Sequence, residues 1–209
     1  MQNIVETIID CLFIVGMVAF VGMTLISSLL ISRRSEAQQT RIVGKSSWLL
    51  SASFWLNLLF SLLFLAIAFA LSYFLWKPFV SVSPALSLTL RVIGLIVFLG
   101  GLGFAVWARW MLGTNWARTT TAGVLLQVDH QLIQKGPFAL VRHPMYLGGS
   151  MTVVGALIAY HTWTVLILLL LCASLIRRAR LEETALSEIF GDQWRAYASR
   201  VPKFFPRLR

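Results

Sequence analysis

The chain has 209 residues, of which 58% are hydrophobic and only 12% are charged, and its formal net charge at pH 7 is +10. Soluble domains use about 45–50% apolar and about 25% charged residues, so this composition excludes an ordinary soluble protein and indicates an integral membrane protein. The basic residues flank apolar runs and form no nucleic-acid-binding motif, which argues against a nucleic acid partner and for contact with anionic lipid headgroups.

Three long apolar runs occupy residues 11–31, 48–76 and 92–112. Each reaches the roughly 20 residues that cross a hydrocarbon core about 30 Å thick, so we expect three transmembrane helices within residues 1–111. Residues 1–10 contain Glu6 and Asp10 but no Lys or Arg, and no small-residue cleavage site follows the first run. We therefore expect a retained span there rather than a signal peptide that is removed.

A fourth apolar run, residues 145–176, is too long for one ordinary span and too short for two full-length spans with a turn. It is either one tilted helix or a hairpin of two short helices that turns near His161. A hairpin gives five spans and puts 16 of the 18 Lys and Arg residues on one side, whereas a single helix divides them 8 against 10. Because cytoplasmic loops carry the basic excess, we expect five transmembrane helices, with the N-terminus outside and the C-terminus in the cytoplasm.

Two polar segments leave the membrane on this cytoplasmic side. The first, residues 112–144, is unusually long for a connection within a compact domain, and such connections are usually functional. The second, residues 177–209, begins as an amphipathic helix, with a predicted break at Gly191 and an end at Pro202. We therefore expect one all-α membrane domain over residues 1–209, made of three helices (1–111), a cytoplasmic loop (112–144), a helical hairpin (145–176) and a cytoplasmic C-terminal helix with its tail (177–209).

Charged residues stand where the fourth run begins, in the letters RHPMY at residues 142–146. Pro144 disfavours helical geometry at His143 and suits the first turn of the helix that follows. Arg142 and His143 are then placed at a helix N-terminus, where the positive end of the helix dipole favours an anionic ligand. The alternative for Arg142 alone is an interfacial anchor whose charged end reaches water, and for His143 alone a hydrogen-bonded interfacial side chain.

Two adjacent acids, Glu182 and Glu183, follow the last apolar run. Neighbouring helical positions point about 100° apart, so we expect at most one of the two carboxylates to face any given pocket squarely. The alternative is ordinary ion pairing along the helix, Arg178 with Glu182 and Arg180 with Glu183. Each such pair stabilises a helix by about 0.3 kcal/mol.

The two polar segments together contain an ordered set of positions: His130, Leu132, Gly136, Pro137, Phe138, Arg142, His143, Pro144, Tyr146 and Gly148, then Glu182, Glu183, Leu186, Phe190, Gly191, Trp194, Tyr197, Arg200, Val201, Pro202 and Pro206. In this set the chain resembles the isoprenylcysteine carboxyl methyltransferase family of membrane methyltransferases and its relatives, the phospholipid methyltransferases. The resemblance covers residues 112–206. Each piece is weak alone, and the ordered set is specific.

This resemblance implies S-adenosyl-L-methionine as the methyl donor. Arg142 or His143 would bind the donor carboxylate, and Glu182 or Glu183 would accept from its ammonium or ribose. The segment His130, Gln131 and Leu132 would line the adenosine side, and Arg109, at the end of the third run, would hold the acceptor carboxylate or serve only as an anchor. The remaining expected cofactor contacts are Gly136, Pro137, Phe138, Pro144, Tyr146 and Gly148.

The expected reaction is carboxyl O-methylation of an isoprenylcysteine-like or other lipid-soluble acceptor, since a carboxylate is already ionised at neutral pH and needs no base. Phospholipid N-methylation is an alternative in which His143, Glu182 or Glu183 would act as the base. A nicotinamide-dependent reductase of the sterol reductase type and a non-catalytic transporter or assembly factor are further alternatives. We expect no metal site, because His161 is predicted to lie across the membrane from His130 and His143.

Overall fold

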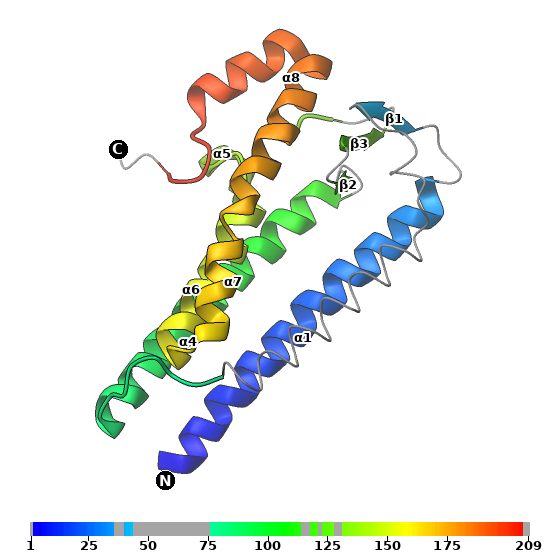
Figure 1. Cartoon of the computed structure of the whole chain (residues 1–209). Helices are drawn as coiled ribbons and strands as arrows, with labels where there is room; N and C mark the ends of the chain where they lie inside the picture. Colours follow the sequence, from blue (N-terminus) through cyan, green and yellow to red (C-terminus); the bar gives the residue numbers. More distant parts are fainter. Residues whose placement is uncertain are drawn as a thin grey trace.

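The structure is a computed structural model, and it describes residues 2–35, 40–43, 76–113, 118–120, 123–127 and 131–206. The expected second span, residues 48–76, lies outside the described residues except for Trp76. The described helices are α1 (Gln2–Ser35), α4 (Pro84–Leu112), α5 (Pro137–Leu140), α6 (Pro144–Tyr160), α7 (Trp163–Leu171) and α8 (Ser174–Arg200). Figure 1 shows α4, α6, α7 and the first part of α8 gathered together, with α1 running alongside.

The closest packing in the described chain is between α4 and α6. A Cβ atom built on Gly155 would lie 2.6 Å from the carbonyl oxygen of Gly94, and one built on Gly148 would lie 2.6 Å from that of Gly101. These two pairs run in opposite directions along the chain, so the helices are antiparallel and their backbones are almost in contact. Small residues permit such an approach where apolar helices associate without water between them.

Aromatic and charged contacts hold α1 against α4 and α6 near the N-terminus of α1. The ring of Phe13 lies 4.5 Å from that of Phe98 and 5.0 Å from that of Tyr160. Asp10 is 3.2 Å from the guanidinium of Arg91 and accepts a 2.7 Å hydrogen bond from the hydroxyl of Tyr160. This cluster lies at the end of α4 where Pro84 begins the helix, and Arg109 lies at the opposite end.

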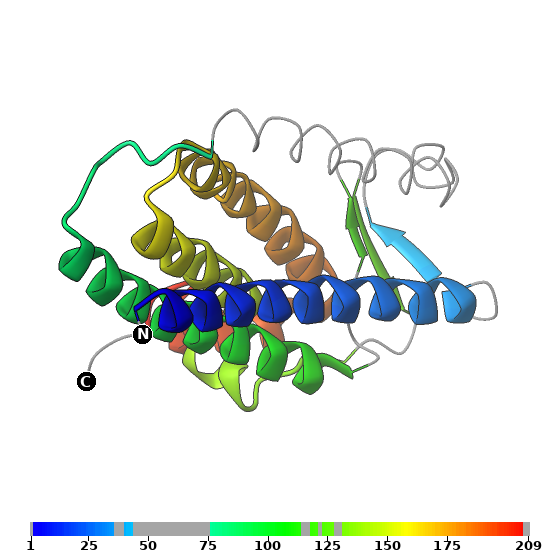
Figure 2. The ribbon, with the colours of Figure 1, turned by 90° about the horizontal axis from the view of Figure 1, so that it is seen from below.

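The chain reverses direction at His161, as the hairpin prediction expects. His161 has the left-handed conformation (φ 48°, ψ 34°), Thr162 is extended, and α7 begins at Trp163. A non-glycine residue rarely adopts this conformation outside a turn. The backbone N–H of Phe79 donates to the carbonyl of His161 over 2.9 Å, so the segment before α4 supports the turn. Figures 1 and 2 both show α6 and α7 side by side.

Two of the described helices are long and apolar enough to cross a membrane, over Ile4–Met23 and Pro84–Leu112. They correspond to the first and third predicted spans. The shorter α6 is apolar over Pro144–Tyr160, and α7 has nine residues. The count of five spans and the orientation of the termini remain predictions.

A small antiparallel sheet, of order β1-β3-β2, was not expected from the sequence. It consists of β1 (Thr40–Val43), β2 (Arg118–Thr120) and β3 (Gly123–Gln127), and in both views it lies near the C-terminal end of α1. The all-α prediction is therefore correct for the helices but omitted these strands. They have only three to five residues each, which is too short for a readable alternation of polar and apolar residues.

The last helix, α8, bends where the sequence predicts a break. Gly191 has φ 49° and ψ −117°, a conformation that favours glycine, and the helix then continues to Arg200. Val201 is extended, so the helix ends just before Pro202 as expected. Figure 1 shows that the bend directs the final turns of α8 back toward α5.

Candidate functional site

The site is built on the short path from α5 to α6, which we call the doorway (residues 141–143). Val141 is extended, His143 is the residue immediately before the helix, and Pro144 is the first residue of α6. This is the geometry that the proline predicts. Before the doorway, the buried Pro137 and Phe138 anchor α5 in the interior. Arg142 and His143 are thus held on the approach to a helix, as expected.

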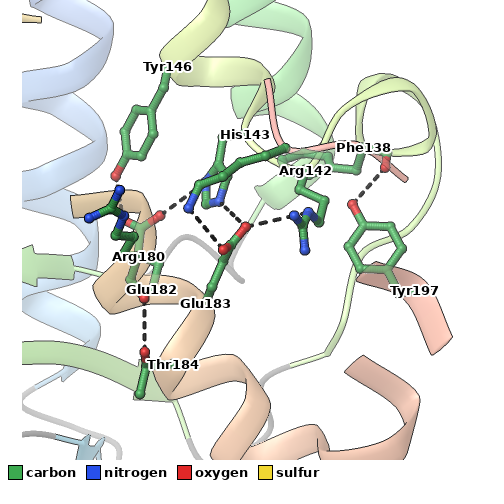
Figure 3. Close-up of polar contacts among 10 residues, drawn as sticks. Phe138, Arg142, His143, Tyr146, Arg180, Glu182, Glu183, Thr184 and Tyr197 are labelled. Atoms are coloured by element: carbon green, nitrogen blue, oxygen red, sulfur yellow. Dashed lines mark hydrogen bonds and ion pairs between the residues drawn. The ribbon is translucent and has the colours of Figure 1, made fainter. Parts of the chain in front are cut away.

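Helix α8 brings both predicted acids to the doorway (Figure 3). The Nε2 atom of His143 is 3.1 Å from Oε1 of Glu183, and its Nδ1 atom is 3.6 Å from Oε2 of Glu182. Both carboxylates thus approach the same imidazole, Glu183 within hydrogen-bonding distance and Glu182 farther away, and which of them faces a ligand stays a prediction. An imidazole ring presents its two nitrogens in different directions, so one ring can contact two side chains that diverge along a helix.

Glu183 is surrounded by cations. Its Oε1 atom is 3.4 Å from Nε of Arg142 as well as close to His143, and its Oε2 atom is 2.9 Å from Nζ of Lys203. Burial alone would raise the pKa of this carboxyl, but the hydrogen bonds from His143 and Lys203 and the charge of Arg142 outweigh burial and lower it to about 2. Glu183 is therefore a fixed negative charge at neutral pH.

The two acids favour the protonated form of His143. Its side chain is 6% exposed, and burial alone would lower its pKa, but the hydrogen bonds and charges of Glu182 and Glu183 together raise the pKa above its ordinary value. The ring stacks on that of Tyr146, with centroids 5.5 Å apart, and the Tyr146 hydroxyl donates a hydrogen bond to Glu182. With a carboxylate near each nitrogen, the imidazole ring lies between the two acids.

The segment after α8 returns to the doorway and completes the cluster. The N–H of Arg142 donates to the carbonyl of Pro202 over 2.9 Å, and the N–H of His143 donates to the carbonyl of Lys203 over 3.1 Å. Within α8, the ring centroid of Trp194 lies 5.8 Å from the guanidinium of Arg142. The buried hydroxyl of Tyr197 donates to the carbonyl of Phe138 over 2.7 Å, so α8 is bonded to α5 as well.

Three side chains of this cluster, Trp194, Tyr197 and Lys203, were not among the predicted site residues. Tyr197 belongs to the ordered motif set, so its place in the motif was a signal of a structural role. Lys203 stands at a motif position that specifies no residue type, and nothing in its sequence context distinguishes it from the other basic residues of the tail. Only the return of the chain to the doorway reveals it.

The other predicted site residues are less closely joined to this cluster. His130 lies outside the described residues, and Gln131 and Leu132 lie on the segment that leads to α5. Nη1 of Arg109 donates to the carbonyl of Gly113 over 3.0 Å. Gly148 faces α4, so its smallness serves helix packing. Their roles toward a cofactor or acceptor stay predictions, as do those of Gly136, Pro137, Phe138 and Pro144.

The chemistry of this cluster suits a ligand that carries both signs of charge. Arg142 and Lys203 are cations suited to a carboxylate, and Glu182 is an acceptor suited to an ammonium or a diol. A methionine-derived donor presents each of these groups, so the side chains present fit it. Among the described residues, no group of three His, Cys, Asp or Glu side chains is placed to hold a metal ion.

Several known proteins are similar in sequence to this chain. The family model described as phospholipid methyltransferase matches residues 89–193, half of the chain. A protein-S-isoprenylcysteine O-methyltransferase of Schizosaccharomyces pombe is 34% identical over 82 residues, which are 38% of this chain and 35% of that protein. The cobalt-zinc-cadmium resistance protein CzcN of Cupriavidus metallidurans is 30% identical over 116 residues, which are 54% of this chain and 50% of that protein.

A solved structure supports the same relationship. The eukaryotic intramembrane Ras methyltransferase ICMT, an isoprenylcysteine carboxyl methyltransferase, aligns with a TM-score of 0.50 and 26% identity, over 66% of this chain and 48% of that chain. The chain spans half or less of the length of each of these relatives. The matched residues 89–193 nevertheless include the doorway and the acid pair. The family match and the likeness of fold relate the chain to membrane methyltransferases, and two of its described helices are long and apolar enough to cross a membrane. The chain therefore belongs to the phospholipid methyltransferase family of membrane methyltransferases.

Proposed function

We propose that the protein transfers a methyl group from S-adenosylmethionine to the carboxylate of a lipophilic acceptor at the cytoplasmic face of the membrane. The observation that carries the proposal is the bridge of His143 between Glu182 and Glu183, with Arg142 and Lys203 beside it. It gathers both signs of charge at one end of an apolar helix pair. Family membership and the likeness to carboxyl methyltransferases support it.

The charged cluster is suited to bind the methyl donor. S-adenosylmethionine, when bound, supplies an electrophilic methyl group. Arg142 would bind the carboxylate of the donor, and Glu182 would accept hydrogen bonds from its ammonium or ribose. The low exposure of His143 and Glu183 keeps water away from the charges, which strengthens each contact. The contribution of the protein is then chiefly positioning and exclusion of water.

The same geometry favours an acceptor that needs no base. Both nitrogens of His143 face carboxylates, which favour the protonated ring, and a protonated ring cannot act as a base. Glu183 is held ionised by three cations, and so weak a base does not deprotonate an ammonium. A carboxylate acceptor, with an ordinary pKa near 4, arrives already ionised. Carboxyl O-methylation is thus the reaction that this cluster suits best.

The acceptor is proposed to reach the site from the bilayer. The doorway directly precedes the apolar α6, and the C-terminal end of α4 with Arg109 lies at the same end of the helix pair. A lipid-soluble molecule that lies along these helices would place its polar end at the doorway. The charge distribution of the sequence assigns this end to the cytoplasm, where a water-soluble donor is present.

Phospholipid N-methylation is the second candidate, because the matching family model is described as phospholipid methyltransferase. Its ammonium acceptor would have to lose a proton before it could react. Glu182, which accepts from Tyr146 and faces His143, would be the nearest base. The family match disfavours the reductase and transporter alternatives, since neither transfers a methyl group.

The test is to supply S-adenosylmethionine with a labelled methyl group to membranes that contain the protein and to extract the lipid-soluble products. Base-labile label is expected, as from a methyl ester, whereas base-stable label would show transfer to nitrogen or sulfur. Arg142→Ala and Glu182→Ala should each abolish incorporation while the protein stays folded. Arg195→Ala is the matched control, because Arg195 is an exposed residue of α8 that pairs locally with Asp192. Full activity in folded Arg142→Ala and Glu182→Ala variants would refute the proposed site.

A further inference from the structure

The segment that follows α8, residues 202–204, lies across the doorway, and we call it the tail strap. Its carbonyls at Pro202 and Lys203 accept from the consecutive N–H groups of Arg142 and His143, over 2.9 and 3.1 Å. Two adjacent backbone hydrogen bonds fix both the distance and the direction of the two segments. The strap therefore sets where the two basic residues of the doorway stand.

The side chain of Lys203 adds a third contact between the tail strap and the site, an ion pair with Glu183 of α8. Its Nζ atom is 2.9 Å from Oε2 of Glu183, while Oε1 of the same carboxylate faces His143 and Arg142. The two oxygens of Glu183 thus have separate partners. With Lys203 in place, rotation of the carboxylate would break a charge-assisted hydrogen bond, so the orientation of Oε1 is fixed.

Phe204 shields this arrangement from water. Its ring centroid lies 5.6 Å from that of His143, and Nζ of Lys203 lies 5.7 Å from the Phe204 centroid. The side chains of Lys203 and Glu183 are 24% and 19% exposed. A partly buried ion pair is screened less by salt and water than a surface pair, so the contact between them is stronger than an exposed one.

We propose that Lys203 is a positioning residue of the donor site, which holds Glu183 so that its other oxygen keeps His143 and Arg142 in place for the donor. The inference rests on the proposed function. Lys203 acts through Glu183 and through the strap, and it needs no contact with the donor itself. Lys203 lies 20 residues beyond Glu183 in the chain and has no periodic relation to the acid pair. The sequence motif therefore does not identify it.

Loss of the Lys203 charge should also change how His143 binds its proton. Among the described residues, the charged and titratable groups that face Glu183 and His143 include Arg142 from the doorway, Tyr146 from α6, Glu182 and Tyr197 from α8, and Lys203 from the strap. Removing the ammonium takes a positive charge from the neighbourhood of His143 and leaves Glu183 freer to pair with it. The alkaline limit of donor binding, where His143 loses its proton, should then move to higher pH.

The experiment compares the full-length protein with Lys203→Met, which keeps the length of the side chain, Lys203→Arg, which keeps the charge, and the exposed control Arg195→Met. The measured quantities are KM for S-adenosylmethionine, kcat, donor affinity by calorimetry and the pH dependence of that affinity. Lys203→Met should raise KM about tenfold, the effect of losing one charge-assisted contact, while kcat stays within about twofold. Lys203→Arg should recover most of the loss, and Arg195→Met should match the wild type.

The outcomes separate this inference from the proposed function. If the wild-type protein neither binds nor uses S-adenosylmethionine, the proposed function fails and the role of Lys203 fails with it. If the wild type is active and Lys203→Met has wild-type KM and an unshifted alkaline limit, only the positioning role is overturned. If Lys203→Met folds poorly, Lys203→Arg and Lys203→Gln are compared instead: the positioning role requires that the arginine variant bind the donor much more tightly than the glutamine variant, and equal affinities overturn it.

Discussion

The charge of Glu183 should be a measurable part of the stability of this protein. Glu183→Gln keeps the size of the side chain and one acceptor oxygen but removes the negative charge that faces Arg142, His143 and Lys203. The fall of its pKa from 4.5 to about 2 corresponds to about 3 kcal/mol, at about 1.4 kcal/mol for each tenfold change in proton affinity. Since about a fifth of the side chain faces solvent, screening reduces our expectation to about 2 kcal/mol.

The sign of the pH dependence follows from the direction of the shift. A carboxyl whose pKa is lowered by folding stabilises the fold above pH 4.5, and this contribution is lost as the pH falls toward about 2. Glu183→Gln should therefore lower the free energy of unfolding at pH 7 and should lack the part of the acid dependence that the carboxyl supplies.

Thermal unfolding in detergent, followed by tryptophan fluorescence at pH 7 and between pH 5 and 3, is a suitable assay. For a chain of this size, a loss of about 2 kcal/mol lowers Tm by about 4–8 °C. Glu188→Gln is the matched control, a glutamate of the same helix outside the charged cluster. If Glu183→Gln unfolds at the wild-type temperature with the wild-type acid dependence, the charge is not held by its three partners and the reasoning is wrong.

Three further perturbations test other parts of the structure. Folding raises the pKa of His143, so its contribution to stability should be complete below its ordinary pKa of 6.5 and lost as the pH rises through the higher folded value. A His143→Gln variant should lack this alkaline loss of stability in unfolding curves measured from about pH 6 to about pH 10. Tyr197→Phe should cost about 1–3 kcal/mol, because it leaves the carbonyl of Phe138 without its buried donor, and infrared or hydrogen-exchange measurements should show a loosened α5. Gly155→Ala should destabilise the protein by about 1–3 kcal/mol, seen as a lower Tm, whereas Gly149→Ala, with open space around it, should be nearly neutral; equal effects would argue against close packing of α4 on α6.

The sequence predicts much of this architecture because local rules decide it. Pro144 sets the start of α6, Gly191 the bend in α8, and Pro202 the end of that helix. The turn at His161 follows from a different kind of rule, the unequal distribution of basic residues across a membrane. Each of these signals is contained in a short window or in a simple count of charges.

The parts that the sequence did not predict depend on contacts between distant residues. The role of Lys203 arises only when the chain returns to the doorway, and nothing periodic connects it with Glu183. The double contact of His143 with both acids depends on the orientation of one ring, which the spacing of Glu182 and Glu183 does not determine. The short strands pair residues of β1 with residues of β3 more than 80 positions later, and neither segment carries a strong strand signal alone.

The bonds between the tail strap and the doorway have a consequence for synthesis. Arg142 leaves the ribosome 60 residues ahead of Pro202, which at about 5–20 residues per second is a delay of roughly 3–12 s. During this interval the two backbone N–H groups at the start of α6 have no carbonyl partners from the tail, while the helices that follow are being synthesised. The charged cluster is therefore completed late in synthesis, only after α6, α7 and α8 have been made.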